Sequence, residues 1–85
     1  MERYTRREGG RAAVEPDQIE NALTRLAAFE DLAFGLEAEQ ASIAARLEQL
    51  RGQHREKTVQ FRELMSQKLT NTSLLVLLER HGLRP

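Results

Sequence analysis

The sequence predicts an all-α protein in which a long, heptad-patterned helix and a shorter returning helix form a helical hairpin, and hairpins assemble into a multi-helix bundle. Three observations lead to this fold class. Apolar residues recur at alternating spacings of three and four from Ile19 to Leu50. A glycine and a charged stretch then interrupt the pattern at residues 52–57. A second amphipathic stretch follows, as expected of a helix that returns along the first.

Residues 1–15 have no apolar periodicity, and the pair Gly9-Gly10 interrupts any helix that begins there. We therefore expect residues 1–15 to form a flexible N-terminal arm that is ordered only by packing on a neighbouring segment. Residues 16–85 are expected to form a single helical domain. A chain of 85 residues has little hydrophobic core, so association with other chains is a natural way to bury more apolar surface.

The first helix is predicted to cover about residues 17–52. Pro16 precedes Asp17, whose carboxylate is a candidate N-cap, and Glu20 completes a capping-box pattern. Ten positions form the apolar stripe of this helix and include one polar residue: Ile19, Ala22, Leu26, Phe29, Ala33, Leu36, Gln40, Ile43, Leu47 and Leu50. Gln40 either fixes the register by pairing with a polar group across the bundle or faces solvent.

Gly35 lies inside this helix, away from the apolar stripe. Glycine destabilises a helix interior by about 1 kcal/mol relative to alanine. Because the apolar pattern continues through Gly35 without a slip, the sequence favours one helix, straight or bent at this residue. The alternative is a helix that ends near Phe34 and another that starts at Glu37.

Residues 53–57 are predicted to connect the helices, and the second helix is predicted at about residues 58–81, with a break considered near 70–72. Threonine, asparagine and serine at that point are typical of helix caps. Thr58 is the candidate N-cap of the second helix. Gly82 is the candidate residue for the left-handed turn that ends it.

Five consecutive apolar residues, Leu74–Leu78, cover every side of a helix, because successive residues are rotated by about 100°. A helical hairpin buries one side only, so we expect further copies of the chain to cover the others. The alternative folds this block between two other helices of its own chain, which requires a break at Gly35. If the chain associates with itself, Leu75→Glu is predicted to dissociate the assembly and to leave most of its helix content unchanged.

The residues expected to form the helical core or the interface between copies are large and apolar. They are Ile19, Leu26, Phe29, Leu36, Ile43, Leu47, Leu50, Phe61, Leu64, Leu74, Leu75, Leu77 and Leu78. Within this set, four residues of the second helix are expected to pack against the first helix: Phe61, Leu64, Leu75 and Leu78.

The formal net charge is zero, with 13 basic and 13 acidic residues. Residues 16–50 contain seven acids and two bases, whereas residues 51–68 contain five bases and two acids, a polarity that can orient their packing. A zero net charge argues against a general nucleic-acid coat and against binding to a membrane surface. Arg51, Arg55 and Lys57 are the candidate contacts for an anion or a nucleic acid.

Residues 61–81 also have the outline of a helix-turn-helix, with a turn at Thr70-Asn71. The second of these helices would read the DNA, but it consists mainly of leucine and valine, which neither contact phosphates nor hydrogen-bond to base edges. A small helix-turn-helix-like nucleic-acid-binding or regulatory protein is therefore the alternative function, and nucleic acid is not the expected partner.

The sequence has no cysteine, no glycine-rich phosphate loop and no metal-binding or nucleophile motif, so no catalytic residue, cofactor or metal is predicted. Its longest apolar run has five residues, far below the roughly 20 that span a bilayer, so no membrane partner is expected. We expect a non-enzymatic interaction or structural protein that associates with itself as a homodimer or larger oligomer. An unknown protein partner remains an open alternative.

Short segments of the chain resemble a known group of proteins. Residues 25–31, RLAAFED, resemble the RLAAYED segment of small, uncharacterised proteins of phages and prophages in gut Firmicutes, and the opening MERYT is similar to their start. Those proteins usually continue with a proline turn, which is missing after Asp31 here, and this favours the continuous helix. The resemblance implies a mobile-element origin and a location in the cytoplasm of a bacterial host. It implies no catalytic residue.

Overall fold

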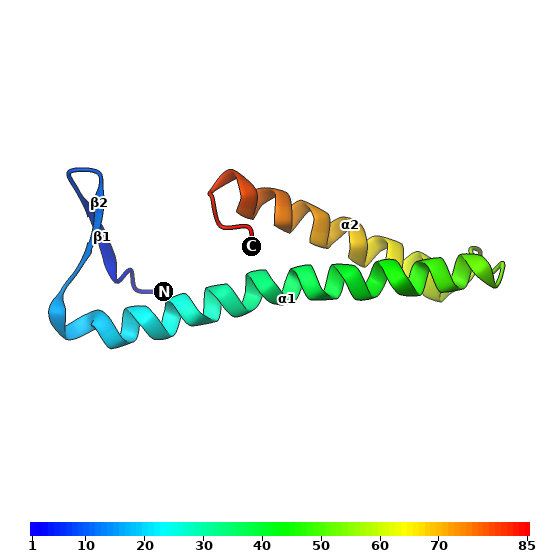
Figure 1. The fold of residues 1–85 in the computed structure, drawn as a ribbon, viewed down its shortest axis with the longest axis horizontal. Coiled ribbons are helices and arrows are strands. Elements are labelled where there is room, and N and C mark those ends of the chain that lie inside the picture. Colours follow the sequence, from blue (N-terminus) through cyan, green and yellow to red (C-terminus); the bar gives the residue numbers. More distant parts are fainter. The chain divides into compact units, whose positions relative to one another are not determined.

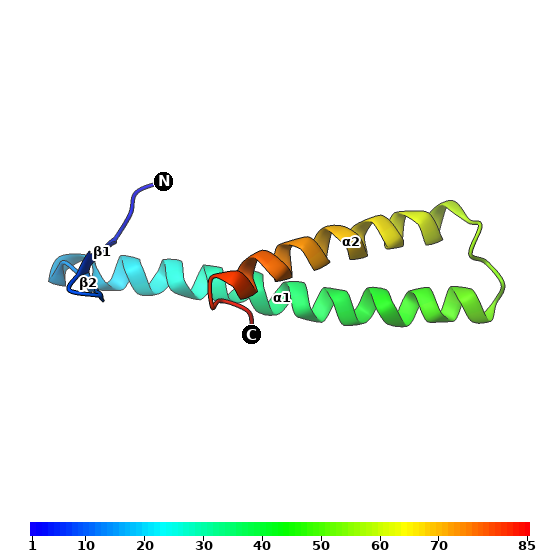
Figure 2. The same cartoon turned by 90° about the horizontal axis from the view of Figure 1, so that it is seen from above.

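The computed structural model describes residues 1–85, which are mostly helical, with two long helices paired as a helical hairpin and a small two-stranded sheet (Figures 1 and 2). The elements in chain order are β1 (Thr5–Glu8), β2 (Arg11–Val14), the 3₁₀ turn η1 (Pro16–Gln18), α1 (Ile19–Gly52) and α2 (Val59–Arg80). The chain divides into two compact units, Met1–Asp31 and Leu32–Pro85.

Strands β1 and β2 form an antiparallel β-hairpin, with Thr5 opposite Val14. The two residues between the strands, Gly9 and Gly10, have φ values of 54° and 80°. Positive φ at both positions suits the tight two-residue turn whose twist matches that of the strands, and glycine adopts it without strain. The all-α prediction therefore does not extend to residues 5–14. The glycine pair that interrupts a helix is also a strong signal for a β-hairpin.

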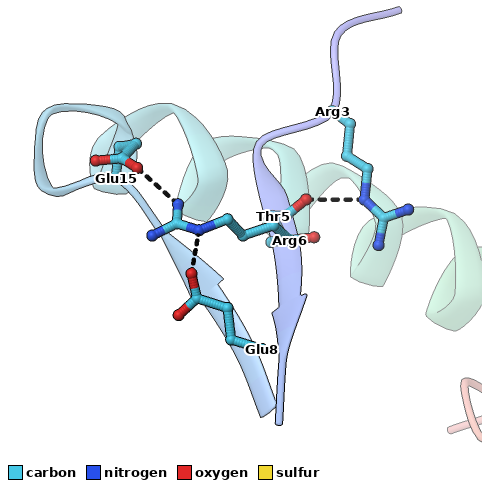
Figure 3. Close-up of polar contacts among 5 residues, drawn as sticks. All are labelled: Arg3, Thr5, Arg6, Glu8 and Glu15. Carbon is cyan, nitrogen blue, oxygen red and sulfur yellow. Dashed lines mark hydrogen bonds and ion pairs between the residues drawn. The ribbon is translucent and has the colours of Figure 1, made fainter. Parts of the chain in front are cut away.

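Arginine side chains make the polar contacts of this β-hairpin (Figure 3). Arg6 bridges two carboxylates, with its Nε 2.6 Å from Glu8 Oε1 and its Nη1 2.7 Å from Glu15 Oε1. Arg3 Nε donates a hydrogen bond to the carbonyl of Thr5 at 2.8 Å. Each exposed ion pair of this kind contributes about 0–1 kcal/mol, so these contacts orient the strands more than they stabilise them.

The helical region begins one residue earlier than expected, at Pro16. Proline is preorganised for the first helical position, and the amide of Gln18 donates to the carbonyl of Glu15 at 2.8 Å. Glu15 is the extended residue before the turn, and no side chain caps it. The prediction that Asp17 is the N-cap is therefore wrong, because Asp17 lies inside the turn that Pro16 starts.

Both long helices run without interruption. Helix α1 continues through Gly35, so of the two arrangements considered the single helix is present. Helix α2 has no break near residues 70–72. The hydroxyls of Thr72 and Ser73 donate to the carbonyls four residues earlier, at 2.8 Å and 3.2 Å. The capping residues of this segment thus satisfy their hydrogen bonds within the helix.

The turn after α1 is closed by His54. The amide of Arg55 donates to the carbonyl of Leu50 at 2.9 Å, and that of His54 donates to the carbonyl of Arg51 at 3.0 Å. This pair of bonds is a Schellman motif, in which the residue at the position of His54 adopts a left-handed conformation. Its φ of 56° is unusual for a residue with a side chain.

The expected caps of α2 are confirmed at both ends. Thr58 Oγ1 accepts a hydrogen bond from the amide of Phe61 at 3.2 Å. At the other end Gly82 has a φ of 70°, and the amide of Leu83 donates to the carbonyl of Leu78 at 2.8 Å. These features form a second Schellman motif, here with glycine at the left-handed position.

The core lies in the unit Leu32–Pro85, where α2 runs back along α1 in both views (Figures 1 and 2). Its buried residues from α1 are spaced by three, seven, four and three positions: Ala33, Leu36, Ile43, Leu47 and Leu50. From α2, Asn71 and Leu75 are buried. Burial of a leucine contributes about 1.5–3 kcal/mol, so these buried residues stabilise the pairing of α1 with α2.

Candidate interaction surfaces

The residues expected to form a core or an interface fall into three groups. Those buried are Leu36, Ile43, Leu47, Leu50 and Leu75. Those half-buried are Phe61, Leu64 and Leu78. Those exposed are Ile19, Leu26, Phe29, Leu74 and Leu77. The first two groups meet in the helical hairpin, whereas the third remains at the surface of the single chain.

The apolar block at the end of α2 is divided between the core and the surface. Leu75 is 2% exposed and lies in the core of the helical hairpin, whereas Leu77 is 51% exposed. A charge at Leu75 would therefore destabilise the helical hairpin itself. Leu75→Glu cannot distinguish a loss of association from a loss of folding. We call the exposed residues Leu74, Val76 and Leu77 the outer patch. Of these, Val76 and Leu77 line a shallow hollow beside the polar side chains of α2.

A second exposed apolar face lies on the first part of α1, and we call its residues Ile19, Ala22, Leu26 and Phe29 the N-terminal stripe. Ala22 is half-buried and the three larger residues are exposed. Three residues of the stripe, Ala22, Leu26 and Phe29, line an open groove of about 340 Å³ together with Arg25 and the extended segment Met1–Thr5. The sequence predicts that Ile19, Leu26 and Phe29 form a core or an interface, and in the structure these three side chains are exposed.

Arg25 holds the extended segment beside this groove. Its guanidinium lies 4.3 Å from the centre of the Tyr4 ring, a cation–π contact, and its Nη1 donates to the carbonyl of Glu2. Both contacts lie within the unit Met1–Asp31. The groove thus has the helix face on one side and a tethered backbone segment on the other.

A polar layer crosses the middle of the helical core. Gln40 Nε2 donates to the carbonyl of Lys68 at 3.0 Å and to Thr72 Oγ1 at 2.8 Å, so this side chain pairs across the helical hairpin. Asn71, which is 1% exposed, accepts a hydrogen bond from Gln67 at 3.0 Å. The Asn71 Nδ2 and Gln40 Oε1 atoms have no partner in the protein.

Asn71 is the core residue that the sequence analysis missed. It lies in a run of capping residue types, which suggested a helix boundary. Its position seven residues after Leu64 and four before Leu75 is the signal that could have placed it on the apolar face of α2.

The basic connector does not gather its cations into one site. Arg51 pairs with Glu48 of its own helix, and its guanidinium lies 5.4 Å from the centre of the Phe61 ring. Arg55 and Lys57 are exposed and make no ion pair. Because α2 is one continuous helix, the turn that a helix-turn-helix requires at residues 70–71 is absent.

The C-terminal residues are tied to α1 by an ion pair. Arg84 Nε lies 2.8 Å from Glu37 Oε1, and Arg84 Nη1 lies 3.5 Å from Glu79 Oε2. The hydrogen bond and the charge of Glu37 raise the pKa of Arg84 above its usual value. The pair anchors the end of the chain to the helical hairpin.

No group of three or more histidine, cysteine, aspartate or glutamate side chains is placed to hold a metal ion. Neither α1 nor α2 contains a stretch apolar enough to cross a membrane. Neither a protein-family model, nor a curated protein, nor a solved structure matches the chain. The outer patch and the N-terminal stripe are the exposed apolar surfaces considered as candidate interaction sites.

Proposed function

We propose that the chain is a non-enzymatic interaction or structural protein that associates with itself through the outer patch. The observation that carries this proposal is the exposure of Leu74, Val76 and Leu77 at the end of α2. Three large apolar side chains within one helical turn are costly to leave in water, and exposed clusters of this kind mark interfaces. In a solution of the purified protein, the outer patch of another copy is the apolar surface available to cover these side chains.

The helical hairpin suits assembly into a multi-helix bundle. Its buried residues on α1, together with the half-buried Gln40, keep alternating spacings of three and four, the pattern of helices that pack nearly parallel or antiparallel. Contact between two outer patches would bring two α2 helices together and place four helices side by side. This arrangement buries the apolar side chains that a single helical hairpin leaves exposed.

The similarity of the segment RLAAFED to phage and prophage proteins supports an origin in a mobile element of a bacterium. We accordingly propose that the protein acts in the cytoplasm of its bacterial host. No catalytic role is proposed, because neither apolar surface presents a nucleophile paired with a base.

The substitution Leu77→Glu tests the outer patch. A buried carboxylate without a partner is strongly unfavourable, so this variant should have a lower average mass than the wild type at the same concentration. Light scattering coupled to size-exclusion chromatography measures the mass, and circular dichroism checks that the helices remain.

Ser66→Glu is the matched control for this experiment. Ser66 is exposed on the same side of α2, about 16 Å from position 77 along the helix axis. It should leave the mass unchanged. An assembly whose mass is unaffected by Leu77→Glu would show that the outer patch is not the interface.

A further inference from the structure

The two helices of the unit Leu32–Pro85 carry contact rows with the same spacing. On α1, the buried residues and the half-buried Gln40 alternate at spacings of three and four up to Leu50. On α2, a row of buried and half-buried residues continues the alternation of three and four: Phe61, Leu64, Lys68, Asn71, Leu75 and Leu78. Each row is the side on which one helix packs against the other.

The two rows are in phase with each other along the chain. Phe61 follows Leu50 by eleven positions, and a helix turns by about 1100° over eleven residues, within about 20° of three full turns. Residues 54 and 57 would fill the gap at spacings of four, three and four. A connection that only reverses the chain does not have to keep this phase. If residues 53–58 were helical, the two rows would form one row on one face of a single helix.

The connection contains no residue that prevents a continuous helix. Residues 53–57, QHREK, include neither proline nor glycine, and glutamine, arginine, glutamate and lysine all favour helices. The nearby Gly52 already belongs to α1. The chain turns at His54, whose φ of 56° strains a residue that has a side chain. The hairpin is therefore bent at a residue that a straight helix would relax.

The contacts between α1 and α2 are symmetric about the connection. Gln40 donates to the carbonyl of Lys68 and to Thr72 Oγ1, so position 40 lies opposite residues 68–72. The midpoint between positions 40 and 70 is residue 55. Two straightened chains can therefore lie antiparallel with the same residues in contact, α1 of each chain against α2 of the other. Such an exchange of identical elements is a low-cost route to a dimer.

We propose that the helical hairpin opens at His54 and exchanges α2 with a second copy, which gives an antiparallel dimer in which residues 53–58 are helical. The interface of this dimer is the α1–α2 contact that one chain already makes, so it requires no exposed surface. The proposal does not rest on the outer patch, through which folded hairpins associate. A helix linked to its partner has a high effective concentration, so we expect exchange after unfolding and refolding at high protein concentration.

A distance within one chain distinguishes the closed from the exchanged form. Ala38 on α1 and Ser66 on α2 are exposed and belong to the same unit. In the hairpin they are about 20 Å apart, because packed helix axes lie about 8–10 Å apart. In a straight helix the 28 positions between them correspond to about 42 Å. The chain has no cysteine, so Ala38→Cys and Ser66→Cys give two unique sites for nitroxide spin labels.

The doubly labelled chain, with Leu77→Glu added to remove association through the outer patch, is mixed with an excess of the unlabelled Leu77→Glu chain. The mixture is unfolded in urea, refolded at high concentration and separated by size-exclusion chromatography. Double electron–electron resonance should give about 20 Å in the monomer and about 42 Å in the dimer. A dimer with the short distance alone, or no dimer, would overturn the inference. The outer patch is tested separately, by comparing the masses of the wild type and Leu77→Glu before any unfolding.

His54→Ala and His54→Gly are matched variants for the hinge, and neither changes the outer patch. Alanine favours the helix and is strained in the left-handed turn, whereas glycine adopts the turn without strain and disfavours the helix. After the same refolding, we expect the dimer fraction to be several times larger for His54→Ala than for His54→Gly. Equal dimer fractions would contradict an exchange that opens at His54.

Discussion

At the scale of single residues, His54 holds the turn between the helices in a strained conformation. Its φ of 56° lies in the left-handed region, where a side chain costs about 1–2 kcal/mol and glycine costs little. The histidine side chain is exposed and makes no hydrogen bond or ion pair that offsets this strain. The positive φ of His54 therefore strains the backbone of the turn, and substitution of His54 by glycine should relieve this strain.

We expect His54→Gly to raise the free energy of unfolding by about 1 kcal/mol, as measured by urea denaturation followed by circular dichroism. Gln53→Gly is the control, because Gln53 does not have a positive φ and glycine there only adds freedom to the unfolded chain. A destabilised His54→Gly variant would mean that the imidazole makes a contact that offsets the backbone strain.

Asn71 is the second residue at which the structure predicts a gain in stability. Its Nδ2 is buried without a partner, and an unsatisfied buried donor costs about 1–3 kcal/mol. Asn71→Leu, of similar size, should therefore raise the midpoint of urea unfolding, although it loses the hydrogen bond from Gln67. A lower midpoint would indicate that Nδ2 binds an ordered water and is satisfied in solution.

At the scale of elements, the helices follow from apolar periodicity and from a few capping residues. Thr58 and Gly82 were recognisable from the sequence because their residue types match the positions that need them. The sequence did not predict the β-hairpin because the glycine pair was treated as a helix breaker only, both flanking strands have just four residues, and the first of them, TRRE, is polar. The capping pattern at Asp17 also failed to predict the helix start, because Pro16 favours the first helical position and the helical region begins there.

The continuity of α1 through Gly35 leads to a prediction for this element. A Cβ atom at Gly35 would meet no other atom within 4 Å, so Gly35→Ala should stabilise the helix by about 1 kcal/mol. The measurement is the thermal unfolding midpoint by circular dichroism. Gly82→Ala is the contrasting control and should lower the midpoint, because Gly82 has a φ of 70°. A stabilising effect of both substitutions would contradict the assigned turn.

The candidate surfaces could be predicted in part. The sequence showed that Leu74–Leu78 could not all be buried in a helical hairpin, but the side chains that face α1 depend on the rotation of α2 about its axis. That rotation places Leu75 in the core and Leu77 at the surface. The sequence likewise identified the apolar stripe of α1 but could not show which of its residues are buried and which are exposed.

At the scale of the whole molecule, the chain presents more apolar helix surface than its own two helices cover. The outer patch and the N-terminal stripe are the two exposed groups of apolar side chains, and the proposed self-association uses the outer patch. The side chain of Gln40 already donates hydrogen bonds to α2 of its own chain. Because these bonds form within one helical hairpin, we expect assembly to join hairpins that have already folded.

The mass of the protein in solution, measured by multi-angle light scattering across a range of micromolar concentrations, tests the central claim most directly. Self-association predicts a mass that is a multiple of 9.7 kDa at the upper concentrations and falls on dilution. A constant mass of 9.7 kDa at every concentration would contradict it.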